Sequence, residues 1–151
     1  MSRMKLPRLV ILLGYANLIP FMAGPLWLTL MPQSAPMWLD HIWVSYITLI
    51  AAFLAGTFWG FALMAAAGPE GKLGILIASV LMLLTWISMW LQFRLSLYGL
   101  AVVFLLLLLA DFWRERTLDT IPGYFKLRTT LTVGVLIAIA WRLLLIGQPQ
   151  V

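Results

Sequence analysis

Long apolar runs alternate with short polar breaks along the chain. A bilayer core about 30 Å thick needs roughly 20 apolar residues as helix, and backbone groups in lipid must be paired within the segment. The pattern therefore predicts an all-α integral membrane bundle of five transmembrane helices in a single domain covering residues 1–151. The predicted helices are 9–31, 42–67, 73–91, 95–113 and 130–146.

The break between the third and fourth runs is short. Only Gln92, Phe93 and Arg94 separate them, without glycine or proline. A single helix over 73–113 would be about 60 Å long, which is twice the membrane thickness. The chain is therefore expected to reverse near Gln92.

Basic residues are unevenly divided between the two ends of these runs, and cytoplasmic loops carry an excess of Lys and Arg. With the N-terminus cytoplasmic and the C-terminus periplasmic, only Arg94 and Arg142 lie towards the outside. The opposite orientation reverses this distribution, so we expect the N-terminus inside. Tryptophans are expected near the outer interface at Trp27, Trp38, Trp43, Trp86, Trp90 and Trp141. The residues placed inside are Arg3, Lys5, Arg8, Lys72, Arg114, Arg116, Lys126 and Arg128.

Composition excludes several classes of protein. The chain is 64% hydrophobic and 10% charged, whereas soluble domains have roughly 45–50% apolar and about 25% charged residues. The chain has no cysteine, and its one histidine is His41. Disulfides, thiolate metal sites and multi-histidine cages are therefore excluded, and no cofactor is predicted. The net charge is +5, and the basic residues flank the apolar spans. This placement favours a membrane surface as the partner and not nucleic acid.

Small side chains recur every four residues in the second run, at Thr48, Ala52, Gly56 and Gly60. They form one helical stripe that lets another backbone approach closely. The stripe predicts helix packing inside the bundle. The alternatives are a dimer face and the lining of a narrow pore.

The first run contains Asn17, Pro20, Gly24 and Pro25. A proline removes a helical hydrogen bond and clashes with the preceding turn, so a kink is predicted at Asn17, Pro20 and Pro25. The Asn17 amide is expected to satisfy a carbonyl freed by Pro20. The alternative is a helix break that lines a binding site, as in some transporters.

Two ionisable residues lie within the predicted spans and therefore need partners. Asp111 has Arg114 at i+3 on the same helix face, and Arg128 begins the next span on the same side of the membrane. An ion pair of Asp111 with Arg114 or Arg128 is predicted; the alternative is a proton relay. Arg142 is expected either to extend to the outer surface or to meet Asp40 or a backbone carbonyl there.

Three segments together resemble a known family: residues 13–24 (LGYANLIPFMAG), 45–60 (SYITLIAAFLAGTFWG) and 121–135 (IPGYFKLRTTLTVGV). The chain is similar to the transmembrane protein 69 family, also called domain of unknown function 3429. Ala55 stands where that family usually has glycine. The resemblance implies a small five-helix protein of the bacterial inner membrane and implies no activity.

The sequence contains no phosphate loop, nucleophile elbow or metalloprotease motif. We therefore expect no catalytic, cofactor-binding or metal-binding residues. The expected function is that of a non-enzymatic accessory or scaffold protein, with the lipid bilayer and a membrane-protein partner or homodimer as its partners. The alternative is a transporter of a small solute or protons that uses the broken first helix and Asp111. That alternative requires a polar cavity joining Asn17, Thr48 and Asp111.

Overall fold

A computed structural model describes residues 8–34, 36–64, 66–117 and 123–146. Over those residues the chain is helical, without strands, and five helical stretches are long and apolar enough to cross a membrane. The prediction of an all-α bundle with five membrane-spanning helices is confirmed. The first span is divided into α1 and α2. The elements are α1 (Arg8–Ala16), α2 (Leu18–Leu30), the short 3₁₀ helix η1 (Pro32–Ser34), α3 (Leu39–Met64), α4 (Pro69–Met89), α5 (Phe93–Thr117) and α6 (Tyr124–Ile146).

The helix boundaries differ most from the sequence prediction at the last span. That span starts at Tyr124, six residues before the predicted start at residue 130. Lys126 and Arg128 interrupt the apolar run, but Arg128 is buried inside the bundle and belongs to the helix. Gly123 precedes the helix with φ 83°, a left-handed conformation that favours glycine. The predicted reversal near Gln92 is confirmed, because α4 ends at Met89 and α5 begins at Phe93.

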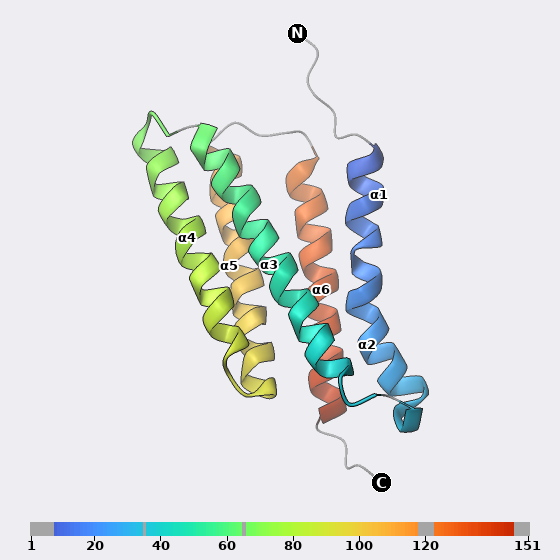
Figure 1. Cartoon of the computed structure of the whole chain (residues 1–151). Coiled ribbons are helices and arrows are strands. Elements are labelled where there is room, and N and C mark those ends of the chain that lie inside the picture. The colour runs from blue at the N-terminus through green and yellow to red at the C-terminus, as the bar shows by residue number, and fades with distance from the viewer. Residues whose placement is uncertain (1–7, 35, 65, 118–122, 147–151) are drawn as a thin grey trace.

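The spans run alternately up and down, and the bundle has two distinct ends (Figure 1). The Arg8 end holds the start of α1, the α3–α4 turn, the end of α5 and the start of α6. The Ile146 end holds η1, the α4–α5 turn and the end of α6. Apart from its continuation α2, α1 contacts only α6 among the described elements, whereas α3 packs most extensively against α4.

Small side chains lie at the closest part of the α3–α4 interface. Lipid supplies no hydrophobic drive between helices, so close backbone packing matters more than in water. A Cβ atom added at Gly74 would lie 2.7 Å from the Cβ atom of Ala62, and a real contact that short essentially never occurs. The two helices therefore approach as closely as their backbones allow. The buried small residues are Ala51, Ala55 and Ala62 on α3 and Gly71, Gly74 and Ala78 on α4.

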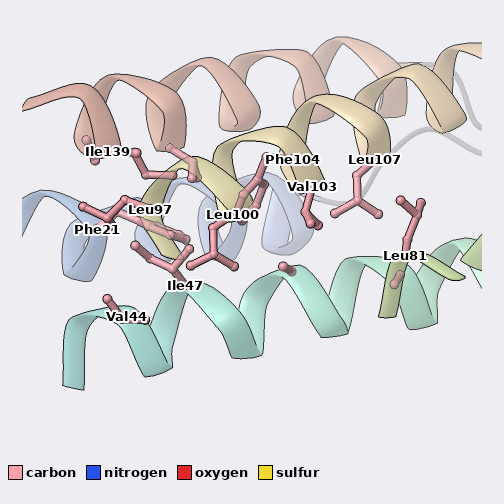
Figure 2. Close-up of a cluster of buried hydrophobic side chains, with 14 of the residues drawn as sticks. Phe21, Val44, Ile47, Leu81, Leu97, Leu100, Val103, Phe104, Leu107 and Ile139 are labelled. Atoms are coloured by element: carbon pink, nitrogen blue, oxygen red, sulfur yellow. The ribbon is translucent and has the colours of Figure 1, made fainter. Parts of the chain in front are cut away.

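Larger side chains fill the space where α2, α3, α5 and α6 meet (Figure 2). The ring of Phe21 makes edge-on contacts with the rings of Tyr46 and Phe104, with centroids 5.0 Å and 6.3 Å apart. Edge-to-face pairs of this kind add stabilisation beyond the apolar area they bury. Ile47 and Leu100 are completely buried in the same cluster. The core therefore joins the first span to α3 and α5.

Tryptophan indoles find polar partners at the Ile146 end. The indole N–H of Trp27 donates to the Ser34 hydroxyl, and that of Trp141 donates to the Thr29 hydroxyl at 3.0 Å. Trp43 differs from the interfacial placement expected from the sequence. Its ring is 4% exposed and lies inside the bundle. The reason is that its indole N–H finds a backbone acceptor on α2.

Candidate functional site

A buried charge cluster lies near the Arg8 end, between α5 and α6. Asp111 is 3% exposed, its Oδ2 atom accepts a hydrogen bond from Nε of Arg128 at 2.8 Å, and the same oxygen lies 2.8 Å from Nη2 of Arg128 in an ion pair. The Nε atom of Arg114 lies 3.7 Å from the Asp111 Oδ1 atom. The structure therefore brings together all three residues proposed from the sequence, with Arg128 in the closer contact. The ion pair between Asp111 and Arg128 joins α5 to α6.

Aromatic rings lie beside the Arg114 guanidinium. Its central carbon lies 4.4 Å from the ring centroid of Phe61 on α3 and 5.0 Å from that of Tyr124 on α6. A cation over the face of an aromatic ring is attracted by the ring quadrupole, most strongly when desolvated. Arg114 is fully buried. Its charge is therefore stabilised by groups from three helices, and neither ring was identified from the sequence.

A second ion pair lies at the opposite end of the bundle. The Arg142 guanidinium donates to both carboxylate oxygens of Asp40, at 2.9 and 2.7 Å. The central carbon of the guanidinium also lies 4.8 Å from the ring centroid of Phe93. Asp40 was one of the partners proposed for Arg142 from the sequence, and the structure shows this pair. The contact joins α6 to the starts of α3 and α5, and Arg142 and Asp111 are not paired with each other.

The first span is interrupted at Asn17. Pro20 has no N–H to donate to the carbonyl of Ala16, where α1 ends. The hydroxyl of Tyr46 donates to the backbone carbonyl of Asn17 at 2.8 Å. The Asn17 side chain makes no capping hydrogen bond. The predicted role of the Asn17 amide is therefore not seen, and α3 supplies a hydrogen bond to the break instead.

The second interruption, at Pro25, is also stabilised from α3. Pro25 lies inside α2 and cannot donate to the Phe21 carbonyl one turn before it. The indole N–H of Trp43 donates to that carbonyl at 2.9 Å. Gly24 makes room for the ring, because a Cβ atom there would lie 2.8 Å from Trp43 Cδ1. No local sequence pattern indicates this hydrogen bond, because it joins residues 22 positions apart.

Replacing Trp43 with phenylalanine should lower the free energy of unfolding by about 1–3 kcal/mol, because it leaves a buried carbonyl without a donor. Adding Pro25→Ala should recover part of that loss, because residue 25 regains an N–H for the Phe21 carbonyl. Denaturant titration of the single and double variants in detergent measures the coupling. If Trp43→Phe lowers the free energy of unfolding by the same amount whether residue 25 is proline or alanine, this account is contradicted.

The small-residue stripe does not lie where the sequence prediction placed it. A Cβ atom at Gly56 or Gly60 would meet nothing within 4 Å beyond the adjoining residues and backbone of its own helix, and Gly56 is exposed. The Thr48 hydroxyl donates to the Val44 carbonyl of its own helix. Thr48, Ala52 and Gly60 are half-buried, so the predicted stripe of Thr48, Ala52, Gly56 and Gly60 is not the fully buried face of α3. The buried face of α3 is the one around Ala51, Ala55 and Ala62, and Gly56 and Gly60 point away from it.

A cleft lies between the first span, α3 and α6, with α5 at its base. Its volume is about 310 Å³, and its lining is mainly apolar. Asn17 lines it, but neither Thr48 nor Asp111 does. This cleft is therefore not the polar cavity joining Asn17, Thr48 and Asp111 that a transporter was predicted to have. Within the described ranges, no three His, Asp or Glu side chains come close enough together to hold a metal ion.

Comparison with known proteins identifies a family but no characterised relative. The comparison with curated proteins and that with solved structures found no match. Residues 6–144 match the family described as a protein of unknown function (DUF3429). The match includes all five helical spans apart from the last residues of α6. The chain therefore belongs to the DUF3429 family of proteins of unknown function.

Proposed function

We propose that the protein is a non-enzymatic accessory protein that packs against another membrane-embedded helix through the outward face of α3. We call this face the α3 stripe: Thr48, Ala52, Gly56 and Gly60. The observation that carries the proposal is that a Cβ atom added at either glycine would meet no atom within 4 Å beyond the adjoining residues and backbone of its own helix. Small residues on an uncovered helix face allow a second backbone to approach closely.

The cost of glycine supports this proposal. A glycine inside a helix is less favourable than alanine by about 1 kcal/mol. Gly56 and Gly60 form a G-x-x-x-G pattern within α3, a spacing associated with helix association in membranes. On a helix face that contacts only lipid, glycine would bring no new contact to offset this cost. A contact with a second protein provides a physical reason for both glycines.

Photo-crosslinking in native membranes tests the proposal. A photoreactive amino acid replaces Leu49, which is 67% exposed and lies seven residues before Gly56 on the same helix face. We expect a discrete protein adduct, and mass spectrometry of the adduct distinguishes a second copy of this chain from another protein. Adding Gly56→Leu should abolish the adduct, because the larger side chain keeps the two backbones apart.

Leu83 provides the matched control, because it is 51% exposed on the outside of α4. The same photoreactive residue there should give lipid adducts without the discrete protein band. Equal protein adducts from both positions, or lipid adducts alone from position 49, would contradict the proposed contact.

We further propose that the protein resides in the bacterial inner membrane with its Arg8 end facing the cytoplasm. The asymmetric distribution of Lys and Arg supports this orientation. Because the chain has no cysteine, one introduced cysteine gives an unambiguous labelling site. Gln33→Cys, beside the Ile146 end, should react with an impermeant maleimide in intact cells, whereas Lys72→Cys should react only after lysis. The reverse pattern would overturn the orientation.

A further inference from the structure

The second half of the first span, α2, is fixed to the bundle by specific contacts. Phe21 is buried in the core, and its backbone carbonyl accepts a hydrogen bond from the indole of Trp43 on α3. Near the end of α2, the hydroxyl of Thr29 accepts a hydrogen bond from the indole of Trp141 on α6. α2 is therefore held by both of the helices beside it.

The first half, α1, has no such attachments. None of its nine residues is buried, and among the described residues no side chain of α1 makes a hydrogen bond or an ion pair with another element. Outside the first span α1 contacts α6, where Leu127 and Leu131 lie next to Gly14. Every Cα atom of α1 lies more than 8 Å from every Cα atom of α3. The first span therefore diverges from α3 towards the Arg8 end (Figure 1).

The boundary between these two halves has the features of a hinge. Pro20 cannot donate to the Ala16 carbonyl, so a bend between α1 and α2 breaks no hydrogen bond at that position, and proline is a common cause of helix kinks. The Tyr46 hydroxyl donates to the carbonyl of Asn17, directly before α2. The pivot is therefore anchored to α3, and the nine residues of α1 extend from it as an arm about 13 Å long.

The cleft lies where α1 and α3 diverge. Val10 and Leu13 line it from α1, and Ile50 and Phe53 line it from α3. All four side chains are apolar, and lipid supplies no hydrophobic drive between helices. Contact of these walls with acyl chains therefore differs little in free energy from contact with each other.

We propose that α1 is a hinged lid on this cleft. It swings about Asn17 between the open position of this structure and a closed position, in which Val10 and Leu13 pack against α3. α2 stays in place during the swing, because its contacts with α3 and α6 lie beyond the pivot. The position of α1 therefore decides whether the cleft is open to the bilayer.

Pulsed electron paramagnetic resonance on the full chain in detergent tests the lid. Because the chain has no cysteine, two introduced cysteines carry the only spin labels. The test pair is Leu9→Cys/Leu76→Cys, at exposed residues of α1 and α4 that do not line the cleft. A swing of about 20° moves the end of the arm by roughly 4 Å, so we expect two distance maxima separated by about that amount. The control pair Ile19→Cys/Leu76→Cys reports on α2 and should give one maximum. Distributions of equal width from the two pairs overturn the lid.

Two proline substitutions distinguish a hinge from fraying at the start of α1. Pro20→Ala provides an N–H for the Ala16 carbonyl and should leave a single distance between labels at positions 9 and 76. Pro25→Ala makes the same change inside α2, beyond the pivot, and should leave both distances. Two maxima in Pro20→Ala, or the loss of one maximum in both variants, would show that the motion does not arise at this hinge and would overturn the proposal.

A disulfide detects the closed position directly. Val10 and Phe53 each lie seven residues from the hydrogen bond at the pivot, on antiparallel helices, and are therefore at similar depth. Cysteines with Cα atoms more than about 7 Å apart cannot be bridged without backbone movement. Val10→Cys/Phe53→Cys should nevertheless cross-link on mild oxidation in membranes, because the swing brings the two positions together.

The matched control crosses the same cleft without the hinge. Phe53→Cys/Leu127→Cys joins α3 to α6, whose Cα atoms also lie more than 8 Å apart. This pair should stay reduced, because both helices are held in the core. Equal yields from the two pairs, or no cross-link from Val10→Cys/Phe53→Cys, overturn the closed position. The lid is separate from the α3 stripe, so the failure of either proposal leaves the other standing.

Discussion

Asp111→Ala should lower the free energy of unfolding by about 3–5 kcal/mol, because it leaves the Arg128 guanidinium buried without its carboxylate. Arg128 is 4% exposed, and its Nε and Nη2 atoms both contact the same Asp111 oxygen, Oδ2. The Arg114 guanidinium, 3.7 Å from the same carboxylate, loses this acidic neighbour too. For a chain of this size the loss corresponds to a fall in Tm of roughly 10 °C or more.

Thermal unfolding in detergent, followed by circular dichroism, measures this effect. Arg94→Ala removes an exposed charge and should change Tm little. Asp111→Leu combined with Arg128→Leu should recover much of the lost stability, because a buried ion pair can often be replaced by apolar side chains at little cost. An Asp111→Ala variant that melts with the parent protein would show that the pair contributes no stability.

Gly74→Leu should destabilise the protein by about 3 kcal/mol through the α3–α4 interface. The new Cβ atom would lie 2.7 Å from the Cβ atom of Ala62, a residue with no exposed surface. Ala62 has no flexible side chain that could move aside, so the helix backbones must separate. Denaturant titration should therefore show a large loss, and cysteines introduced across this interface should form disulfides less readily.

Gly56→Leu is the matched control for Gly74→Leu. It makes the same substitution in a helix interior, but the new Cβ atom meets nothing within 4 Å beyond the adjoining residues and backbone of its own helix. Leucine has a higher helix propensity than glycine, so the monomer should be unchanged or slightly more stable. Equal losses at the two positions would mean that the Gly56 face of α3 also packs inside the monomer, and would contradict its outward orientation.

The five spans and the chain reversal near Gln92 could be predicted because each depends on local properties. A run of apolar residues as long as the bilayer is thick must be helical, whatever lies beside it. The same local criterion placed the start of the last span too late. It treated Lys126 and Arg128 as polar loop residues, although the partner that buries Arg128 is Asp111 on α5.

The chemistry of the interior was predictable only in part. Asp111, Arg114 and Arg128 could be proposed as a group because a buried charge needs an opposite charge on the same side of the membrane. The rings of Phe61 and Tyr124 around Arg114 could not, because no local pattern distinguishes them from lipid-facing aromatic residues. The same holds for Trp43 and Tyr46, whose backbone acceptors lie on α2 and at Asn17.

Run length and composition alone determined that this chain is an all-helical protein with five spans, because pairing of backbone groups in lipid leaves no other arrangement for such runs. Only the tertiary structure decided which face of each helix meets a neighbour. Along α3, small residues form one stripe through Gly56 and another through Ala51, Ala55 and Ala62. Both stripes suit close packing, and the rotation of α3 about its axis follows from the neighbours it packs against.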